Sequence, residues 1–360
     1  MLKTVLAASF FQLTGGWRAL ASQATPVAMP GSALEGRLDA VLAPYADDRR
    51  FFGAALIAID GKPVLRKGYG FANPMQKIAN TPETGYQIAS ITKTFTASLI
   101  MQLRDEGKLS IDDPASLYLS GYPNLERDGV AVTIKQLLSH TSGVVDFLSL
   151  YDLENPSSFP PDLPALIDNI KRQPLAFTPG SDYLYSNSGY LFLGRIIEQI
   201  TGSSWETELN RRLLEPLGMT HTWLTPPADP GPQAIGFLSV RGLLLPISTF
   251  GRTDLAEAAG GITSTVDDLL IWDQALWSGK VVSLETLAEM KTPVLNDYGL
   301  GLSHTSLDSM PAIGHFGHTV GFRTDYEHIP KLNATIIILS NREDIELDEI
   351  SEALASELKQ

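Results

Sequence analysis

The sequence predicts an α/β fold in which a mainly antiparallel sheet, flanked by helices, is interrupted by a helical subdomain. Three observations predict it: strand-like segments at both ends of the chain, a helix-rich stretch between them, and 360 residues of which 44% are hydrophobic and 19% charged. Such a chain can bury a large core, which favours a globular protein over a disordered one. We expect sheet segments at about 33–85 and 245–360, and the helical subdomain at about 86–244.

The first elements are a helix and a strand pair. Ser32 can cap a helix whose apolar residues fall on one face, and residues 52–59 and 63–71 then have the pattern of two strands. Asp60-Gly61-Lys62 supplies the turn, because glycine tolerates positive φ and aspartate can bond the local backbone. The expected core positions of the helix are Leu34, Leu38, Val41, Leu42 and Tyr45.

Helices dominate the middle of the chain. Residues 91–106 have apolar positions at helical spacing, and Gly107 fits the C-terminal stop. Further helices are expected at 133–138, 163–172 and 188–200, the last ending before Gly202 and followed by another helix through Leu214.

The C-terminal third returns to sheet. A helix at 266–276 precedes strands near Leu300, at 322–329 and at 334–340, with residues 330–333 closing a hairpin. Residues 343–358 form an acidic amphipathic helix in this prediction. Its candidate core positions are Ile345, Ile350, Leu354 and Leu358.

Residues 1–24 have the features of a secretory signal peptide. Lys3 gives a positive start, residues 5–17 are mostly apolar, and Ala19-Leu20-Ala21 and Ser22-Gln23-Ala24 offer cleavage sites. Arg18 and the polar interruptions also fit an ordinary N-terminal extension. No other stretch approaches the roughly 18 apolar residues of a membrane span. We expect a periplasmic or secreted protein, with residues 33–360 as its domain and no stable membrane insertion of the mature chain.

Composition excludes several classes of function. The formal net charge of −14 repels nucleic acid and anionic membranes, although solubility alone explains an acidic balance. The chain has no cysteine, so disulfides, thiolate metal sites and a cysteine nucleophile are excluded. It also lacks a His-Glu-x-x-His element and a Gly-x-Ser-x-Gly nucleophile elbow. We expect no metal, no cofactor and no nucleic-acid partner.

Ser90-Ile91-Thr92-Lys93 lies where a loop enters the helix expected at 91–106. Residues three apart share a helix face, so Lys93 can bring its nitrogen to the Ser90 hydroxyl. A desolvated lysine can lose its proton near neutral pH and act, directly or through a tyrosine, as the base for acyl transfer. The alternative is a capping serine beside a solvated lysine, and Ser356-Glu357-Leu358-Lys359 is a chance copy of the pattern.

Two further segments carry polar or glycine-rich patterns. Tyr185-Ser186-Asn187 lies on a loop-to-helix corner, where side chains can face a cleft; a packed aromatic residue explains Tyr185 equally well. The segment 314–321, Gly-His-Phe-Gly-His-Thr-Val-Gly, has glycines along an expected edge strand, where a peptide-like substrate could add as another strand. The alternative is a glycine-bearing turn with two incidental histidines.

Together these segments resemble the superfamily of serine β-lactamases and D-alanyl-D-alanine peptidases, specifically its branch of class C β-lactamases, D-aminopeptidases and esterases. The resemblance covers nearly the whole mature chain. It rests on Ser90-Ile91-Thr92-Lys93, Tyr185-Ser186-Asn187 and His315-Phe316-Gly317 in family order, and on two further segments, at 137–143 (Leu-Leu-Ser-His-Thr-Ser-Gly) and 259–265 (Ala-Gly-Gly-Ile-Thr-Ser-Thr). It implies a β-lactamase/transpeptidase-like fold with the active site between the sheet and the helical subdomain.

The resemblance also implies roles for individual residues. Ser90 attacks a carbonyl, Lys93 and Tyr185 share proton transfer, and Asn187 binds the substrate amide and holds Lys93. His315 and Gly317 belong to the third motif, and the backbone N–H groups of Ser90 and His318 form the oxyanion hole. By the same resemblance, His140 is structural. Activity is expected to rise toward alkaline pH, with His315 adding an acidic limb.

The third motif sets the substrate question. Class C β-lactamases have lysine where this chain has His315, so efficient β-lactam hydrolysis is not expected and β-lactams are slow substrates or inhibitors. His304 and Arg323 are the two candidate cations for a substrate carboxylate. The resemblance implies a serine hydrolase acting on small-molecule or short peptide substrates, similar to D-Ala-D-Ala carboxypeptidases and D-amino acid peptidases. A carboxylesterase with weak β-lactamase activity and a β-lactam sensor without turnover are the alternatives.

Overall fold

A computed structural model describes residues 33–152, 156–240, 243–247 and 253–360. The predicted signal peptide at 1–24 and the predicted helix cap at Ser32 lie outside the described residues. Within the described part, no helix has both the length and the apolar character needed to cross a membrane. Ser32–Gln360 groups as one compact unit, so the subdomain boundaries near residues 86 and 245 stay predictions.

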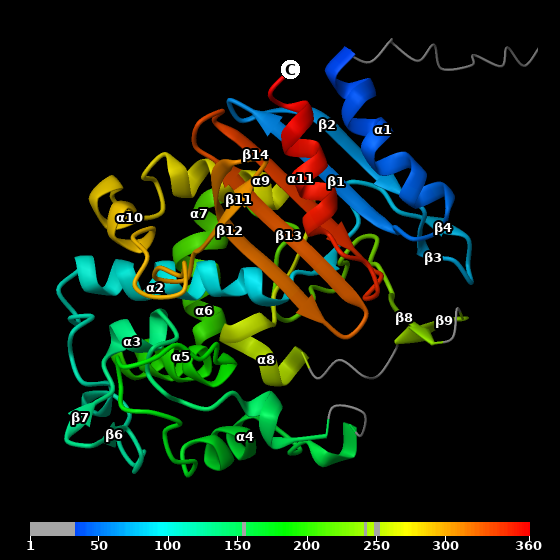
Figure 1. The fold of residues 1–360 in the computed structure, drawn as a ribbon. Coiled ribbons are helices and arrows are strands. Elements are labelled where there is room, and N and C mark those ends of the chain that lie inside the picture. Colours follow the sequence, from blue (N-terminus) through cyan, green and yellow to red (C-terminus); the bar gives the residue numbers. More distant parts are fainter. Residues whose placement is uncertain (1–32, 153–155, 241–242, 248–252) are drawn as a thin grey trace, which may run out of the picture. The chain divides into compact units, whose positions relative to one another are not determined.

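The predicted antiparallel sheet is confirmed. Its six strands run in the order β11-β12-β13-β14-β1-β2, and every neighbouring pair is antiparallel (Figure 1). Asp60 and Gly61 make the turn between β1 and β2 with φ of 49° and 68°, which glycine and aspartate tolerate. The strands are β1 (Gly53–Ile59), β2 (Lys62–Tyr69), β11 (Ser303–Leu307), β12 (Met310–Thr319), β13 (Phe322–Ile329) and β14 (Ala334–Ser340).

Helices cover both faces of this sheet because side chains alternate along each strand. Helices α1 (Ala33–Asp47) and α11 (Asp348–Glu357) lie side by side on one face and pack on Ile57, Ile336 and Ile338 (Figure 1). The opposite face, which includes Leu56 and Ile337, joins the core formed with the other helices. Strands β1 and β14 are therefore buried on both sides.

The helix-rich middle of the chain is also confirmed. Several of its helices begin and end at residues that commonly cap helices. Thr133 caps α3 in a capping box with Gln136, and Gly107 and Gly202 have φ of 70° just after α2 and α5. The helices are α2 (Thr92–Asp105), α3 (Ile134–Leu138), α4 (Leu163–Ile170), α5 (Asn187–Thr201), α6 (Trp205–Leu209), α7 (Glu215–Leu217), α8 (Thr253–Gly260), α9 (Val266–Trp277) and α10 (Leu284–Met290), with a π-helical turn at Asn210–Leu214 between α6 and α7.

Short strand pairs outside the main sheet complete the fold. Within the described residues they are β3 (Phe71–Asn73) with β4 (Ile78–Ala79), β5 (Tyr86–Gln87) with β10 (Thr263–Ser264), β6 (Glu126–Arg127) with β7 (Val130–Ala131), and β8 (Gly236–Val240) with β9 (Leu243–Ile247). The pair β5–β10 brings the segment 259–265 next to the start of α2, because Ile88 N–H donates to the Ile262 carbonyl at 2.9 Å.

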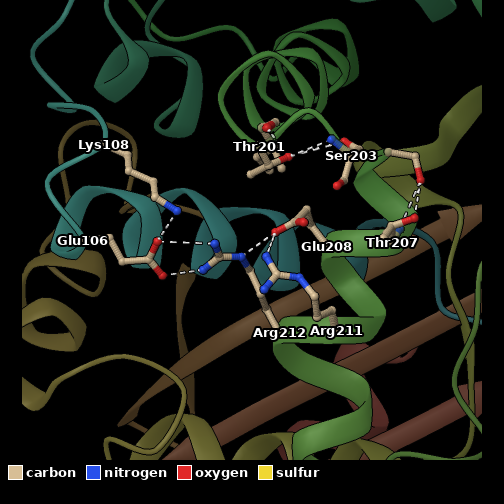
Figure 2. A network of polar contacts seen from close by, with 10 residues as sticks. Glu106, Lys108, Thr201, Ser203, Thr207, Glu208, Arg211 and Arg212 are labelled. Atoms are coloured by element: carbon tan, nitrogen blue, oxygen red, sulfur yellow. Dashed lines mark hydrogen bonds and ion pairs between the residues drawn. The ribbon is translucent and has the colours of Figure 1, made fainter.

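A charged network joins the C-terminal end of α2 to the helices after α5 (Figure 2). Arg212 contacts Glu106 at 2.5 Å and the buried Glu208 at 2.5 Å, and Lys108 contacts Glu106 at 2.7 Å. The hydrogen bond from Arg212, assisted by Lys108, lowers the pKa of Glu106 to about 2. Helix α2, which carries Lys93, is thus linked at its C-terminal end to α6 and the π-helical turn.

Two differences from the prediction concern the C-terminal third of the chain. The helix expected at 343–358 begins only at Asp348, because Ile345 and Leu347 reach the core as part of an irregular segment. Residues 314–321 were expected on an edge strand, but β12 has β11 beside it. Strand β11 pairs with β12 only as far as Gly314. Among the strands that the structure describes, none pairs with the remaining half of β12 on that side, so the edge there is open.

Candidate active site

Ser90 lies in the short 3-10 helix η1 (Ala89–Ile91), which leads directly into α2. Its neighbour Ala89 has φ of +46°, a left-handed conformation that costs about 1–2 kcal/mol for a residue with a side chain. Backbone strain of this kind concentrates at functional sites. The serine is therefore presented at the N-terminal end of α2 by a sharp, strained turn.

Gly317 lets η1 approach the sheet closely. A Cβ atom at Gly317 would lie 2.4 Å from the Ile88 carbonyl oxygen and 2.2 Å from Thr324 Oγ1, so no larger residue fits. Thr324 Oγ1 itself donates to the Ile88 carbonyl at 3.0 Å and fixes this contact. The glycine in the third motif thus places Ser90 beside β12.

Lys93, on the first turn of α2, is fully buried and contacts three oxygen atoms. Its Nζ lies 2.9 Å from Ser90 Oγ, 2.7 Å from Asn187 Oδ1 and 2.6 Å from the Ala259 carbonyl oxygen. Burial lowers the pKa of Lys93 to about 7, against the opposing effect of the Asp146 carboxylate. A large share of Lys93 is therefore neutral at pH 7, and the neutral amine has two protons and one lone pair to distribute among three oxygens.

Tyr185 packs against the same amine. The Lys93 nitrogen lies 4.8 Å from the centre of the Tyr185 ring, and the phenol oxygen is buried with no hydrogen bond from any residue that the structure describes. Burial raises the pKa of Tyr185 well above its usual value, against a lowering contribution from Ser90. Tyr185 is thus a neutral phenol beside Ser90, suited to passing on a proton but not to acting as a phenolate.

Asn187 is the first residue of α5, which Ser186 caps by accepting the Gly189 N–H at 3.1 Å. Its Oδ1 accepts from Lys93, and its Nδ2 donates to the Asp146 carboxylate at 3.1 and 3.2 Å. The amide oxygen of Asn187 is therefore directed at Lys93, and the second N–H of Nδ2 is available to contact a substrate. Sequence reasoning missed Asp146, whose signal was its place three residues after the Leu137–Gly143 segment.

His315 is fully buried on β12 and makes two hydrogen bonds. Its Nδ1 lies 2.6 Å from the Phe316 carbonyl oxygen, to which it can only donate, so Nε2 accepts from the Tyr298 hydroxyl at 2.9 Å. Burial lowers the pKa of His315 to about 3, aided by the charge of Lys93. We therefore expect the buried ring to stay neutral above pH 5, in contrast to the acidic limb expected of His315 from the sequence. Tyr298 was also missed, because no sequence pattern marks a loop residue that meets β12 only in the fold.

The backbone N–H of His318 and its imidazole ring lie in different surroundings. Val320 and Gly321 form the two-residue turn between β12 and β13, so Thr319 and Phe322 make the first, hydrogen-bonded pair of the ladder. Hydrogen-bonded and non-hydrogen-bonded pairs alternate in an antiparallel ladder, so the next pair, His318 and Arg323, is not hydrogen-bonded. The backbone N–H of His318 therefore lies on the open edge of β12. Its imidazole is largely exposed and contacts Glu343 at 3.0 Å.

His140 holds the irregular segment that carries Tyr185. Its Nδ1 accepts the Ser186 N–H at 3.0 Å, its carbonyl accepts the Leu184 N–H at 2.9 Å, and its ring centre lies 4.2 Å from that of Tyr185. Burial lowers the pKa of His140 well below its usual value, so it stays neutral. These contacts give His140 a supporting place behind the site.

The two candidate cations for a substrate carboxylate are engaged elsewhere. The His304 ring contacts the Lys291 carbonyl oxygen at 2.6 Å, and Arg323 Nε donates to the Glu343 carbonyl at 3.1 Å. Arg323 pairs across the hairpin with His318, so its side chain shares the sheet face of His318, whereas His315 and Gly317 share the other. The structure thus brings together Ser90, Lys93, Tyr185, Asn187, His315 and Gly317, and leaves both of these cations outside the group.

Comparisons with known proteins identify the family of the chain. The family model described as Beta-lactamase matches residues 38–358. The putative penicillin-binding protein PbpX of Bacillus subtilis (strain 168) is 33% identical over 260 residues, covering 71% of this chain and 63% of that protein. A D-aminopeptidase of Brucella anthropi is 28% identical over 303 residues, covering 81% of this chain and 56% of that protein. The chain thus spans roughly three fifths of the length of these relatives.

A solved structure has the same fold. The octameric penicillin-binding protein homologue from Pyrococcus abyssi superimposes with a TM-score of 0.81 at 28% sequence identity, covering 90% of this chain and 77% of that one.

Proposed function

Because the chain belongs to the β-lactamase family, we propose that it is a serine hydrolase that forms an acyl-enzyme on Ser90. The observation that carries this proposal is the contact between Ser90 Oγ and a buried Lys93 amine at 2.9 Å, with the Lys93 pKa lowered to about 7. An amine that is neutral at working pH and touches the hydroxyl can serve as its base. We also propose that the chain belongs to the class C β-lactamase-like branch of this family.

The site residues supply each proton transfer of the reaction. Neutral Lys93 takes the Ser90 proton while Oγ bonds to the substrate carbonyl carbon, and the resulting oxyanion lies near the backbone N–H groups of Ser90 and His318. The proton then passes from Lys93, through the Tyr185 hydroxyl, to the departing nitrogen or oxygen as its bond to carbon breaks. A water molecule hydrolyses the ester on Ser90 by the same transfers in reverse.

Peptide-amide and ester bonds are the proposed targets, in the manner of D-alanyl-D-alanine carboxypeptidases and D-amino acid peptidases. The similarity to a D-aminopeptidase supports peptide-amide bonds as targets. The open edge of β12 suits a peptide substrate that adds to the sheet as another strand. The buried, neutral His315 offers no positive charge in the third motif. We therefore propose that β-lactams are slow substrates or inhibitors.

A carboxylesterase is the second candidate, favoured by the engagement of His304 and Arg323 with backbone carbonyls. An ester needs no cation at its leaving group. A sensor that acylates without turnover is less consistent with the site, because Lys93 and Tyr185 remain placed for the proton transfers that deacylation needs.

We also propose that the protein is exported, on the basis of residues 1–24 alone. N-terminal sequencing of the protein recovered from the producing cell checks this. A new N-terminus near Ala21 or Ala24 supports export with cleavage, and an intact Met1 on protein inside the cell contradicts it.

A substrate panel tests the proposed reaction. Nitrocefin, a D-Ala-D-Ala peptide, a D-amino acid anilide and short p-nitrophenyl esters are each incubated with the unchanged chain and with Ser90→Ala. We expect rapid turnover of the esters, weaker cleavage of the D-amino acid substrates and slow turnover of nitrocefin, all dependent on Ser90. Turnover that persists in Ser90→Ala contradicts the proposal.

Amidation of the substrate's C-terminus is expected to have little effect. An unpaired carboxylate entering a partly dry cleft costs several kcal/mol, and the amide avoids this cost. Amidating a D-Ala-D-Ala peptide should therefore lower kcat/KM by less than about tenfold, or about 1.4 kcal/mol. A much larger loss would indicate a cation that grips the carboxylate, and Arg323→Ala and His304→Ala would then identify it.

The pH dependence should follow Lys93. Because Lys93 acts in its neutral form and burial lowers its pKa to about 7, kcat/KM for an uncharged ester should rise with pH through a midpoint near 7. His315, with its pKa near 3, should leave this profile unchanged above pH 5. A His315-dependent limb between pH 5 and 7, lost in His315→Gln, would contradict the burial of that ring.

A further inference from the structure

The carboxylate of Asp146 lies behind the Lys93 amine, on the far side of Asn187. Asp146 Oδ1 accepts the Asn187 backbone N–H at 3.2 Å, and its two oxygens accept from Asn187 Nδ2 at 3.2 and 3.1 Å. Asp146 immediately precedes the 3-10 helix η3 (Phe147–Leu150), which packs against α5. Asp146 therefore holds both the backbone and the side chain of Asn187.

These contacts allow only one orientation of the Asn187 amide. A carboxylate accepts hydrogen bonds and does not donate them, so the amide nitrogen must face Asp146 and the amide oxygen must face Lys93. A flipped amide would place an oxygen against the carboxylate and N–H groups against Nζ. The 2.7 Å contact between Asn187 Oδ1 and Lys93 thus depends on Asp146.

We propose that Asp146 is a positioning residue that, by fixing the Asn187 amide, directs the lone pair of neutral Lys93 at the Ser90 hydroxyl. This inference rests on the proposed function of Ser90 and Lys93. Asn187 Oδ1 and the Ala259 carbonyl oxygen can each accept one hydrogen bond from the two N–H groups of the neutral amine, and neither oxygen can donate one. The remaining direction, toward Ser90 Oγ, then holds the lone pair.

Asp146 also influences the charge of Lys93. The groups that face the amine are the Asp146 carboxylate, the neutral rings of His140 and His315, and the phenols of Tyr185 and Tyr190, whose ring centres lie 4.8 and 5.4 Å from Nζ. The negative charge of Asp146 raises the pKa of Lys93 against the effect of burial. Removing that charge should therefore lower the pKa of Lys93.

The experiment measures the rate at which a fluorophosphonate labels Ser90, as a function of pH, in the unchanged chain and in Asp146→Asn. In this reaction Ser90 Oγ bonds to phosphorus, fluoride leaves, and Lys93 takes the serine proton, so no natural substrate is needed. Asparagine keeps the shape of Asp146 but can also donate, which permits the flipped Asn187. We expect the limiting labelling rate to fall by about tenfold or more, as for lost hydrogen bonds to a charged group.

Two readouts separate positioning from structural damage. In Asp146→Asn the midpoint of the pH profile should move to lower pH while the limiting rate falls, and the reagent concentration for half-maximal rate should change by less than about threefold. Asp146→Ser, which is smaller and also uncharged, should give the same pair of effects and serves if Asp146→Asn does not fold. Asp268→Asn is the matched control: Asp268 is buried and accepts hydrogen bonds from the His221 backbone N–H and the Thr222 hydroxyl, neither of which belongs to the candidate site.

The outcomes distinguish this inference from the proposed function. A lower rate with a lower midpoint in the Asp146 variants, and an unchanged profile in Asp268→Asn, support it. An unchanged rate, or a lower rate with an unmoved midpoint, overturns it while leaving Ser90 as the nucleophile. If Ser90 of the unchanged chain is not labelled at all, the proposed function fails and this inference fails with it.

Discussion

Replacing Ser90 with alanine is expected to abolish turnover of every substrate while leaving the fold intact. The Ser90 hydroxyl is the atom that would bond to the substrate, and no other hydroxyl contacts the Lys93 amine among the described residues. Loss of a serine nucleophile costs at least about a thousandfold in kcat. Ser90 is only partly buried at the start of a helix, so the melting temperature should change little. Steady-state kinetics and thermal unfolding measure the two effects.

Ser356→Ala is the matched control for Ser90→Ala, because Ser356 and Lys359 repeat the same spacing at the C-terminus. Ser356 and Lys359 both contact Asp308 instead of each other, so they form no base and nucleophile pair. Ser356→Ala should keep full activity. Retention of a tenth of the activity by Ser90→Ala, or a large loss in Ser356→Ala, would contradict the assignment of Ser90.

Replacing Lys93 with methionine should also remove most of the activity, by about a hundredfold to ten-thousandfold, because general base catalysis contributes that range. Methionine has a similar length and no charge, so it fills the buried site without a base. Lys93 itself is costly to bury: with its pKa lowered to about 7, the folded state binds fewer protons than the unfolded state between pH 7 and 10.5. The contribution of Lys93 to stability is therefore least favourable below pH 7 and improves as pH rises above 7.

The stability of Lys93→Met tests the same argument. Removing the buried ammonium offsets the loss of a donor to Asn187 Oδ1 and the Ala259 carbonyl, so the variant should stay folded. It should also lose the part of the pH dependence of unfolding that Lys93 causes between pH 7 and 10.5. Urea unfolding at several pH values measures this. Substantial activity in Lys93→Met would contradict Lys93 as the base.

Local patterns predicted much of the fold. The helices expected at 91–106 and 133–138 and the turn at Asp60 and Gly61 depend on nearby residues. The structure contains all three, with the helices at Thr92–Asp105 and Ile134–Leu138. The helix expected at 343–358 was partly wrong because burial of Ile345 is compatible with an irregular segment as well as with a helix. The short strand β11, which covers half of β12, had too weak a pattern for its start at Ser303 to be predicted.

The candidate site was only partly accessible to sequence reasoning. Ser90 and Lys93 share a helix, so their contact follows from spacing, whereas Tyr185 and Asn187 were identified through the resemblance. Asp146 and Tyr298 were missed because their contacts join loops that lie far apart in the sequence. The lowered pKa of His315 could not be predicted from the sequence because it depends on complete burial of the ring in the fold.

Covalent trapping of the acyl-enzyme tests the central claim most directly. The unchanged chain is mixed with a fluorophosphonate or a penicillin, digested, and the modified peptide is located by mass spectrometry. We expect a single stoichiometric adduct on Ser90, retained in Ser356→Ala and absent from Ser90→Ala. Hydrolysis without any adduct, or an adduct on another residue that persists in Ser90→Ala, would contradict the claim that Ser90 is the nucleophile.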